Sequence, residues 1–403
     1  MNPTIEITPA RPLTSPSEVT DLLVRITPTA EATPAPRPPL DLAVVIDTSG
    51  SMNGLPLQLA KEAVVLVNQT LSPEDRLSVV SFNSGVQVVL PLQKIGPAER
   101  LQRQLDRLHA GGSTALHGGW QMGSALLQGD AMPGNLPRVL LLTDGRANVG
   151  VTQPRAIAAD VALALSRSVS TSTVGVGMRY DEQVLESIAW AGDGNYHFAE
   201  TPEALPGLFE AELESLRTTV GRLASLGISG VEVVDVLNDL RTLPTGRLAL
   251  PPLRAERSLD LLLRIKARAG ETLGLRLAWT DAWDQRQTHR AFFVLPQAES
   301  DSVASEHPEV VRVRAGLLAA RVQRVVAMLA SLGKLEEALA TLESSRSQLE
   351  MGIRSGLNLS AELETVAELE RRLRKGERQS ASKFAGSRAY SKTTGRDDQT
   401  LKN

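Results

Sequence analysis

The sequence contains no cysteine, and this absence excludes several classes of site. Disulfide scaffolds, thiolate zinc sites, cysteine nucleophiles and iron–sulfur clusters all require that residue. The chemistry that remains must use oxygen or imidazole groups. The composition also agrees with a reducing compartment.

An excess of charge of one sign is also lacking. The chain has 43 Lys and Arg residues against 46 Asp and Glu residues, for a formal net charge of −3. No global field therefore attracts nucleic acid or anionic lipid, and any such partner would need a local patch. The charge balance predicts no nucleic-acid partner.

Long apolar runs are missing too. No uncharged apolar run reaches the roughly 18 residues that cross a bilayer. The first residues, MNPTIEITPARPL, lack the basic-then-apolar plan of a signal peptide. These two absences predict a cytoplasmic protein without a membrane span.

The 403 residues of the chain correspond to two or three domains of roughly 150 residues each. Their pattern predicts an α/β fold with an accessory β-sandwich and a C-terminal helical module. Residues 40–217 alternate short buried strands with amphipathic helices, which is typical of a Rossmann-like, doubly wound sheet. The strands are expected at residues 40–47, 76–82, 86–90, 138–144 and 168–177, and the helices at residues 56–70, 97–108, 115–127, 154–168, 181–191 and 202–217.

The flanking segments follow other patterns. In residues 218–297 apolar and polar residues alternate with period two, which favours an antiparallel sandwich. In residues 308–375 apolar residues recur at i, i+3 and i+4, which favours three antiparallel helices. Residues 1–39 hold one predicted strand, near 19–26, and a proline-rich connector. Residues 376–403 offer few large apolar groups, so we expect a disordered tail.

The strand near residues 19–26 needs a partner because a lone strand cannot satisfy its backbone donors and acceptors. A small sandwich has open edges that such a strand can fill. We therefore expect this strand to pair with residues 218–297. The sandwich would then be discontinuous in sequence, with the α/β domain inserted in it.

Chemistry-bearing side chains follow the first predicted strand of the α/β segment. The strand ends in Asp47, and the turn after it brings Ser49 and Ser51 in a D-x-S-x-S pattern. Ligands bind at this carboxyl edge in open α/β sheets. One carboxylate and two hydroxyls can converge there, and hard oxygen donors suit Mg²⁺ or Mn²⁺.

Two later segments bring more oxygen donors to the same edge. The run GGST, residues 111–114, leads into a predicted helix and leaves the Thr114 hydroxyl at the edge. A second buried strand ends in TDG, so Asp144 adds a second carboxylate. Each of these side chains alone could instead cap a helix. Their joint spacing and strand context favour a metal site.

The order of these pieces resembles the metal-ion-dependent adhesion site (MIDAS) of the von Willebrand factor A family. The likeness extends to AKEAVVLVNQTLSPEDRLSVVSF and to STVGVGMRYDEQVLESIAWAGDGNYHF. These segments are similar to bacterial members that resemble inter-alpha-trypsin inhibitor heavy chains and are often labelled calcium-activated chloride channel-like. A channel would need membrane spans, so that label is not carried over.

The resemblance implies a metal site made of five residues: Asp47, Ser49, Ser51, Thr114 and Asp144. It implies that the hydroxyls bind the ion directly, that at least one acid acts through water, and that an acidic residue of a partner protein completes the shell. Mg²⁺ or Mn²⁺ is the expected ion, with Ca²⁺ as a third option.

Other catalytic or cofactor sites receive little support from the sequence. The five histidines show no HExxH pattern, and neither a GxSxG elbow nor a P-loop occurs. The sequence therefore predicts a binding or scaffolding protein and not an enzyme. The alternative is a regulatory subunit of a MoxR- or chelatase-type ATPase system, and a metal-dependent hydrolase is a third reading.

Overall fold

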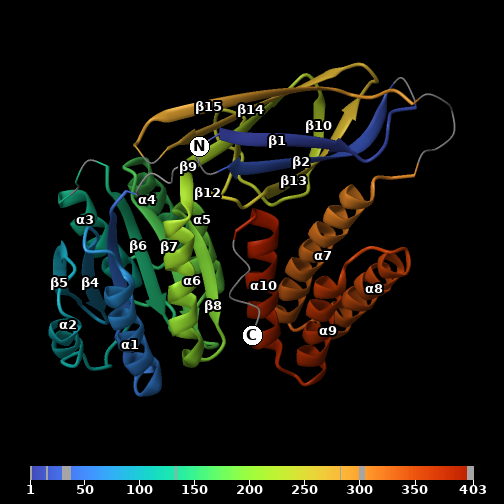
Figure 1. The fold of residues 1–403 in the computed structure, drawn as a ribbon. Coiled ribbons are helices and arrows are strands. Elements are labelled where there is room, and N and C mark those ends of the chain that lie inside the picture. The colour runs from blue at the N-terminus through green and yellow to red at the C-terminus, as the bar shows by residue number, and fades with distance from the viewer. Residues whose placement is uncertain are drawn as a thin grey trace. The chain divides into compact units, whose positions relative to one another are not determined.

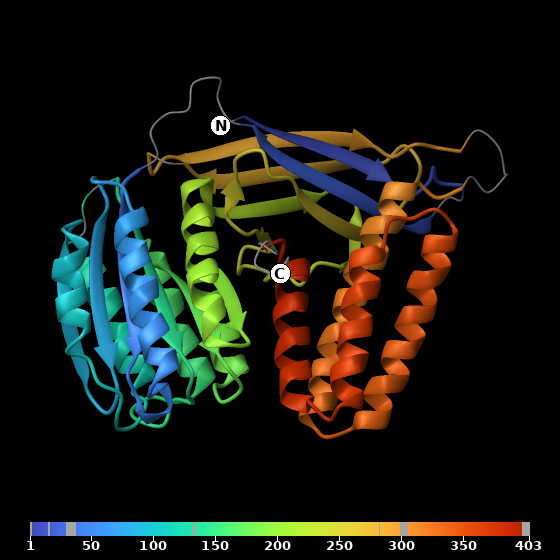
Figure 2. The ribbon, with the colours of Figure 1, turned by 60° about the horizontal axis from the view of Figure 1, so that its bottom comes forward.

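The computed structural model describes residues 2–14, 17–29, 38–130, 132, 134–281, 283–298 and 305–396. The chain divides into two compact units, shown in Figures 1 and 2. The α/β unit contains residues 36–217, and the sandwich unit contains residues 1–35 and 218–398. In sequence, the α/β unit is thus inserted between two parts of the sandwich unit.

One six-stranded sheet, with the strand order β5-β4-β3-β6-β7-β8, forms the centre of the α/β unit. All neighbouring strands are parallel except β5, which runs antiparallel to β4. The strands are β3 (Leu40–Asp47), β4 (Arg76–Phe82), β5 (Val86–Lys94), β6 (Leu136–Thr143), β7 (Ser170–Val176) and β8 (Asp193–Ala199). The helices are α1 (Leu55–Thr70), α2 (Ala98–Leu105), α3 (Leu116–Gly129), α4 (Pro154–Ser166), α5 (Glu182–Ala191) and α6 (Leu205–Arg217), with short 3₁₀ turns η1 (Gly50–Met52) and η2 (Pro202–Ala204).

Strand β3 lies at the centre of this sheet and is buried along its whole length. Leu42, Val44 and Ile46 share one core with α1 and α6, which cover one face of the sheet in Figure 1. On the other face α3 lies very close to β3, because a Cβ on Gly123 would stand 2.6 Å from the Cγ2 atom of Val45. This close approach fixes the segment before α3 beside the end of β3.

The sandwich unit has two antiparallel sheets in its described residues. The four-stranded sheet has the order β1-β2-β13-β10, and the five-stranded sheet has the order β11-β9-β14-β15, with β12 paired to β9. Their bounds are β1 (Asn2–Pro9), β2 (Glu18–Thr29), β9 (Thr219–Ser229), β10 (Glu232–Val236), β11 (Leu248–Ala249), β12 (Leu253–Arg254), β13 (Leu259–Ala267), β14 (Thr272–Thr280) and β15 (Arg286–Val294).

Successive side chains along each strand point to opposite faces of the sheet, and this alternation shows how the layers of the sandwich unit are arranged. On β2, Leu22 and Val24 point into the core between the sheets, and Leu23 points to the other side. There Leu23 meets Val313 and Leu317 of α7 (Pro308–Ser331). The four-stranded sheet is therefore the middle layer, with the five-stranded sheet on one side and helices on the other.

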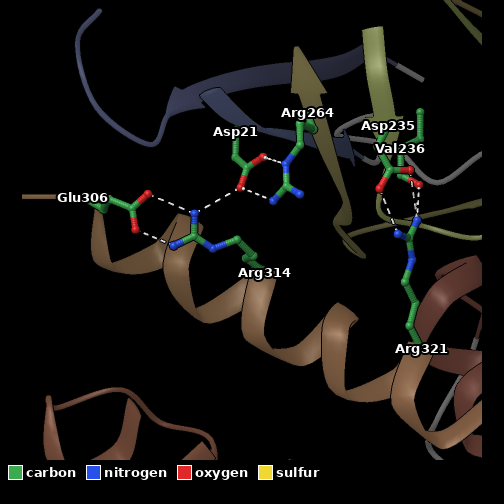
Figure 3. A network of polar contacts seen from close by, with 7 residues as sticks. All are labelled: Asp21, Asp235, Val236, Arg264, Glu306, Arg314 and Arg321. Atoms are coloured by element: carbon green, nitrogen blue, oxygen red, sulfur yellow. Dashed lines mark hydrogen bonds and ion pairs between the residues drawn. The ribbon is translucent and has the colours of Figure 1, made fainter. Parts of the chain in front are cut away.

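Ion pairs accompany this apolar contact between α7 and the four-stranded sheet (Figure 3). Asp21 of β2 is almost fully buried and accepts hydrogen bonds from Arg264 of β13 at 2.9 Å and from Arg314 of α7 at 3.0 Å. Further along α7, Arg321 donates to both carboxylate oxygens of Asp235 on β10, at 2.8 and 3.2 Å. Three strands and the helix are thus linked by charge as well as by packing.

Four helices follow one another in the described part of the C-terminal module: α7, α8 (Leu335–Arg354), α9 (Ser360–Arg374) and α10 (Arg378–Thr394). The expectation of a disordered tail from residue 376 is wrong for α10, and residues 397–403 lie outside the described residues. Ala381 and Ala385 are fully buried in the helical core. The prediction counted only large apolar groups, whereas small side chains let α10 pack closely against its neighbours.

Five strands of the structure, β1, β8, β9, β11 and β12, were not expected from the sequence. Strand β1 carries Pro3 and Pro9, which mask its strand character but are tolerated because β1 is an edge strand. Strand β9 contains Gly221 and Gly227, which interrupt its apolar alternation. The two-residue strands β11 and β12 are too short to show a period. The proline-rich connector falls mostly on residues 30–37, outside the described residues.

Candidate metal centre

The turn after β3 folds its polar side chains back on one another. Asp47 is fully buried, and its Oδ1 atom accepts a hydrogen bond from the backbone N–H of Ser49 at 2.7 Å. The hydroxyls of Ser49 and Ser51 lie 3.2 Å apart. The backbone N–H of Gly50 donates to the carbonyl of Gly112 at 3.1 Å. The turn is therefore tied to the segment that precedes α3.

Two other segments, one after β6 and one before α3, complete the arrangement. Asp144 follows β6 directly, and its Oδ1 atom accepts a hydrogen bond from the hydroxyl of Ser51 at 2.6 Å. Thr114 precedes α3 and is almost fully buried, and its N–H donates to the side-chain carbonyl of Asn148 at 2.7 Å. The N–H of Asn148 donates in return to the carbonyl of Thr114 at 3.1 Å. Three separate segments of the chain thus meet at the carboxyl edge of the sheet.

The position around Gly145 shows how closely the oxygen atoms converge. A Cβ atom placed on Gly145 would stand 3.3 Å from Oγ1 of Thr114, 3.4 Å from Oγ of Ser51 and 3.7 Å from Oδ2 of Asp47. Because residue 145 is glycine, no side chain occupies that position. The structure therefore brings all five predicted site residues together, directly or through Ser51.

Burial shapes the electrostatics of the two acids. Loss of water raises the pKa of Asp47 to about 6, although hydrogen bonds from Thr143 and Ser49 act in the opposite direction. Burial likewise raises the pKa of Asp144, against the hydrogen bond from Ser51 and the charge of Arg179. Neither carboxylate forms an ion pair with Lys, Arg or His in the described residues. A cation at this edge would offset the cost of burying both negative charges.

The donor set fits a hard divalent cation. It consists of two carboxylates and three hydroxyls, all of them oxygen donors. Across the described residues no three His, Cys, Asp or Glu side chains gather in a way that could hold a metal ion. An ion at the end of β3 would accordingly depend on Ser and Thr hydroxyls as much as on the acids.

The helix-cap alternative finds no support for two of these side chains. Ser49 holds the N-cap position of η1 but makes no capping hydrogen bond through its side chain. Helix α3 has Ala115, not Thr114, at its N-cap position. Both hydroxyls are instead placed at the common edge.

Sequence reasoning missed two residues that support the site. The hydroxyl of Thr143 donates to Oδ2 of Asp47 at 2.5 Å, and Asn148 holds the backbone of Thr114. Thr143 directly precedes Asp144, so the sequence already indicated that Thr143 lies at the same strand end and near the site. Nothing in the local pattern distinguishes Asn148, because its role depends on a contact with a distant loop.

This architecture defines a class: a mixed sheet covered by helices, with oxygen donors from three segments at one edge. Residues 41–211 match the family model of the von Willebrand factor type A domain. The α/β unit is therefore a von Willebrand factor type A domain. Domains of this family commonly mediate metal-dependent protein interactions.

Individual relatives agree with this assignment. The chain is 30% identical over 201 residues to an uncharacterized protein, sll0103, from Synechocystis sp., which covers 49% of this chain and 45% of that protein. It is 32% identical over 167 residues to human inter-alpha-trypsin inhibitor heavy chain H4, covering 39% of this chain and 18% of the heavy chain. The chain thus spans less than half the length of these curated relatives.

A solved structure extends the likeness to the whole chain. A von Willebrand factor type A protein from Catenulispora acidiphila superposes with a TM-score of 0.73 at 17% identity, covering 97% of this chain and 96% of that one. At this identity the comparison shows a shared fold, including the sandwich and the helices. Among the residues that the structure describes, no helix has the length and apolar character needed to span a membrane.

Proposed function

We propose that the α/β unit binds one divalent metal ion at the end of β3 and uses it to hold a carboxylate of a partner protein. The observation that carries this proposal is the convergence of oxygen atoms beside Gly145, where those of Thr114, Ser51 and Asp47 lie 3.3 to 3.7 Å from the position of a Cβ atom. Hydrogen bonds already hold these side chains in place, so little ordering is needed when an ion binds.

The residues that would hold the ion are Asp47, Ser49, Ser51, Thr114 and Asp144. Mg²⁺ or Mn²⁺ suits this oxygen set, with Ca²⁺ as a third option. A bound cation would supply positive charge at the protein surface. Because three of the five donors are neutral hydroxyls, that charge retains attraction for one more anionic ligand, and a Glu or Asp of a partner protein has the right chemistry.

This function is binding and not catalysis. Von Willebrand factor type A domains are generally interaction modules, and residues 41–211 match that family. Both carboxylates of the site accept hydrogen bonds from neighbouring groups, which fix their positions. An arrangement of fixed oxygen atoms supports recognition of an ion and of the ligand that it carries.

Titration calorimetry with Mg²⁺ and Mn²⁺ tests the metal site. Wild-type protein is expected to bind one ion per chain, and Asp47→Asn is expected to weaken binding at least tenfold, about 1.4 kcal/mol, because a charged ligand becomes neutral. Asp106→Asn, which removes an exposed acid elsewhere in the α/β unit, is the matched control. Equal binding by all three proteins would contradict the assignment.

Thr114→Ala tests the partner's role separately. Asp47 and Asp144 keep their charges in this variant, so it should retain the metal while capturing much less partner protein from native extract in Mg²⁺ buffer. EDTA should release what wild-type protein captures. Thr152→Ala, an exposed threonine of the same unit, is the control. A stability loss of roughly 1 kcal/mol with unchanged capture would indicate only a helix-end role.

A further inference from the structure

The outer face of the five-stranded sheet carries four arginines, which we call the arginine face: Arg247, Arg276, Arg286 and Arg290. Strands β14 and β15 pair so that Arg276 stands opposite Arg290 and Thr280 opposite Arg286. Opposite residues of an antiparallel pair share one side of the sheet. The alternating residues of β14, Leu273, Leu275 and Leu277, fill the core. The arginines of both strands therefore point away from the core.

Backbone and hydroxyl acceptors hold two of these guanidinium groups in place. An Nη atom of Arg247 donates to the carbonyls of Ser225 at 3.0 Å and of Arg276 at 2.9 Å. Arg286 donates to the carbonyl of Leu223 at 2.9 Å and to the hydroxyl of Ser225 at 3.2 Å. These neutral acceptors fix the positions of the side chains but leave their positive charges uncompensated.

No member of the arginine face forms an ion pair with Asp or Glu in the described residues. Elsewhere in the same unit, Arg264, Arg314 and Arg321 each meet a carboxylate (Figure 3). Burial, together with the nearby charge of Arg276, lowers the pKa of Arg247 below its usual range. Like charges directly opposite each other, as in the Arg276 and Arg290 pair, destabilise a sheet. The arginine face therefore carries several positive charges that meet no carboxylate in the described residues.

We propose that the arginine face docks an extended acidic segment of a partner protein. A guanidinium group binds a carboxylate through two parallel hydrogen bonds, so several fixed arginines match a row of Asp or Glu side chains. Along β15 the same face continues from Arg290 to Phe292 and Val294, which are 72% and 61% exposed. The surface thus offers charge at one end and an apolar contact at the other.

The charge of the whole chain favours a short acidic segment over nucleic acid. The protein carries a net charge of −3 and a sequence pI near 6.1. A long polyphosphate would meet repulsion beyond the patch, whereas nucleic-acid-binding domains are usually strongly basic. A peptide with a few carboxylates and one apolar side chain needs only the surface that the arginine face and Phe292 supply.

The test uses the full chain in EDTA, which separates this surface from any metal-dependent binding. The probe is a fluorescent Glu-rich peptide that contains one Leu, and the control peptide has Gln in place of each Glu. Wild-type protein should bind the Glu peptide at low salt and release it at high salt. R276Q/R290Q should bind at least tenfold more weakly. R103Q/R155Q, which removes two exposed arginines of the α/β unit, should bind like wild type.

Three outcomes would overturn the proposal: equal affinity of the two double variants, equal binding of the Gln peptide, or tighter binding of a single-stranded oligonucleotide than of the Glu peptide. Melting curves show that the variants are folded. Because Arg276 and Arg290 repel each other, R276Q/R290Q should melt no lower than wild type, and F292S provides a second variant that keeps all four charges. F292S should weaken the binding of the Glu peptide, while the salt dependence of that binding stays unchanged.

Discussion

Gly145 has no side chain at the point where a Cβ atom would stand close to three oxygen atoms of the candidate metal centre. Gly145→Ala places a methyl group 3.3 to 3.7 Å from those oxygens. We expect metal affinity to fall at least tenfold, about 1.4 kcal/mol, while the melting temperature changes little. Calorimetric titration with Mg²⁺ measures the first quantity and thermal unfolding in EDTA measures the second.

Gly207→Ala is the matched control for this substitution. Gly207 lies in α6, and a Cβ added there meets nothing within 4 Å. This variant should bind metal like wild type. Unchanged metal binding by Gly145→Ala as well would mean that the ion, if bound, lies away from this position.

The five candidate ligands could be found in the sequence because each stands at a strand end or before a helix, where a short motif is visible. Thr143 and Asn148 could not be assigned roles in the same way. Thr143 contacts Asp47 of another strand, and Asn148 contacts the segment before α3, 34 residues away. Such partners depend on which strands become neighbours, which local spacing does not encode.

At the scale of elements, the first turn of α7 makes the sandwich unit sensitive to acid. Hydrogen bonds from Arg312 and then from Arg25 of β2 lower the pKa of Glu309 from 4.5 to about 2. The folded chain therefore gains stability from ionised Glu309 above pH 4.5, and that gain is lost as the pH falls from 4.5 toward 2. Arg25 also pairs with Asp260 of β13, so the contact joins α7 to two strands.

Glu309→Gln should remove part of this pH dependence. At pH 6 the variant is expected to unfold at lower denaturant than wild type. The difference should shrink at pH 3, where Glu309 is protonated in the unfolded chain but still mostly ionised in the folded one. Glu336→Gln, an exposed glutamate of α8, serves as the control. A difference that stays constant from pH 6 to pH 3 would show that the Glu309 pairs contribute no net stability.

Strand β8 illustrates why some elements resist prediction. Its buried side chains include Asn195 and His197, which both hydrogen-bond to the fully buried Glu212 of α6, at 2.7 and 3.0 Å. Burial alone would raise the pKa of Glu212, but the His197 hydrogen bond and the charge of Arg138 hold it well below its usual range. A buried strand that carries polar residues shows no apolar run. By contrast, β3 and β6 are nearly all apolar, so both strands could be predicted directly from the sequence.

At the scale of the whole molecule, the four-stranded sheet depends on residues far apart in the sequence. Strand β2 lies between β1 and β13 and contributes Leu22, Val24 and Ile26 to the core. Deleting residues 1–29 should therefore expose β13 to amide exchange while β3 and β6 of the α/β unit stay protected. Hydrogen exchange followed by mass spectrometry reads each region separately.

A shorter deletion is the control for the deletion of residues 1–29. Removing residues 1–9 takes away the edge strand β1 and leaves β2 in place, so β13 should keep most of its protection. If the longer deletion also leaves residues 259–267 protected, β2 is not needed for this sheet and the dependence between the two parts of the unit is weaker than the pairing suggests.

The insertion of the α/β unit also sets an order of events on the ribosome. All residues of the α/β unit have been synthesised by residue 217, whereas β2 must wait for β13, which begins about 230 residues after β2 ends. At roughly 5 to 20 residues per second this delay is about 10 to 50 seconds. During that time the nascent chain carries the apolar strand Leu22–Ile26 without its partner strand β13. A ribosome-bound chaperone would therefore have most to protect at the N-terminal end of this chain, while the inserted unit folds first.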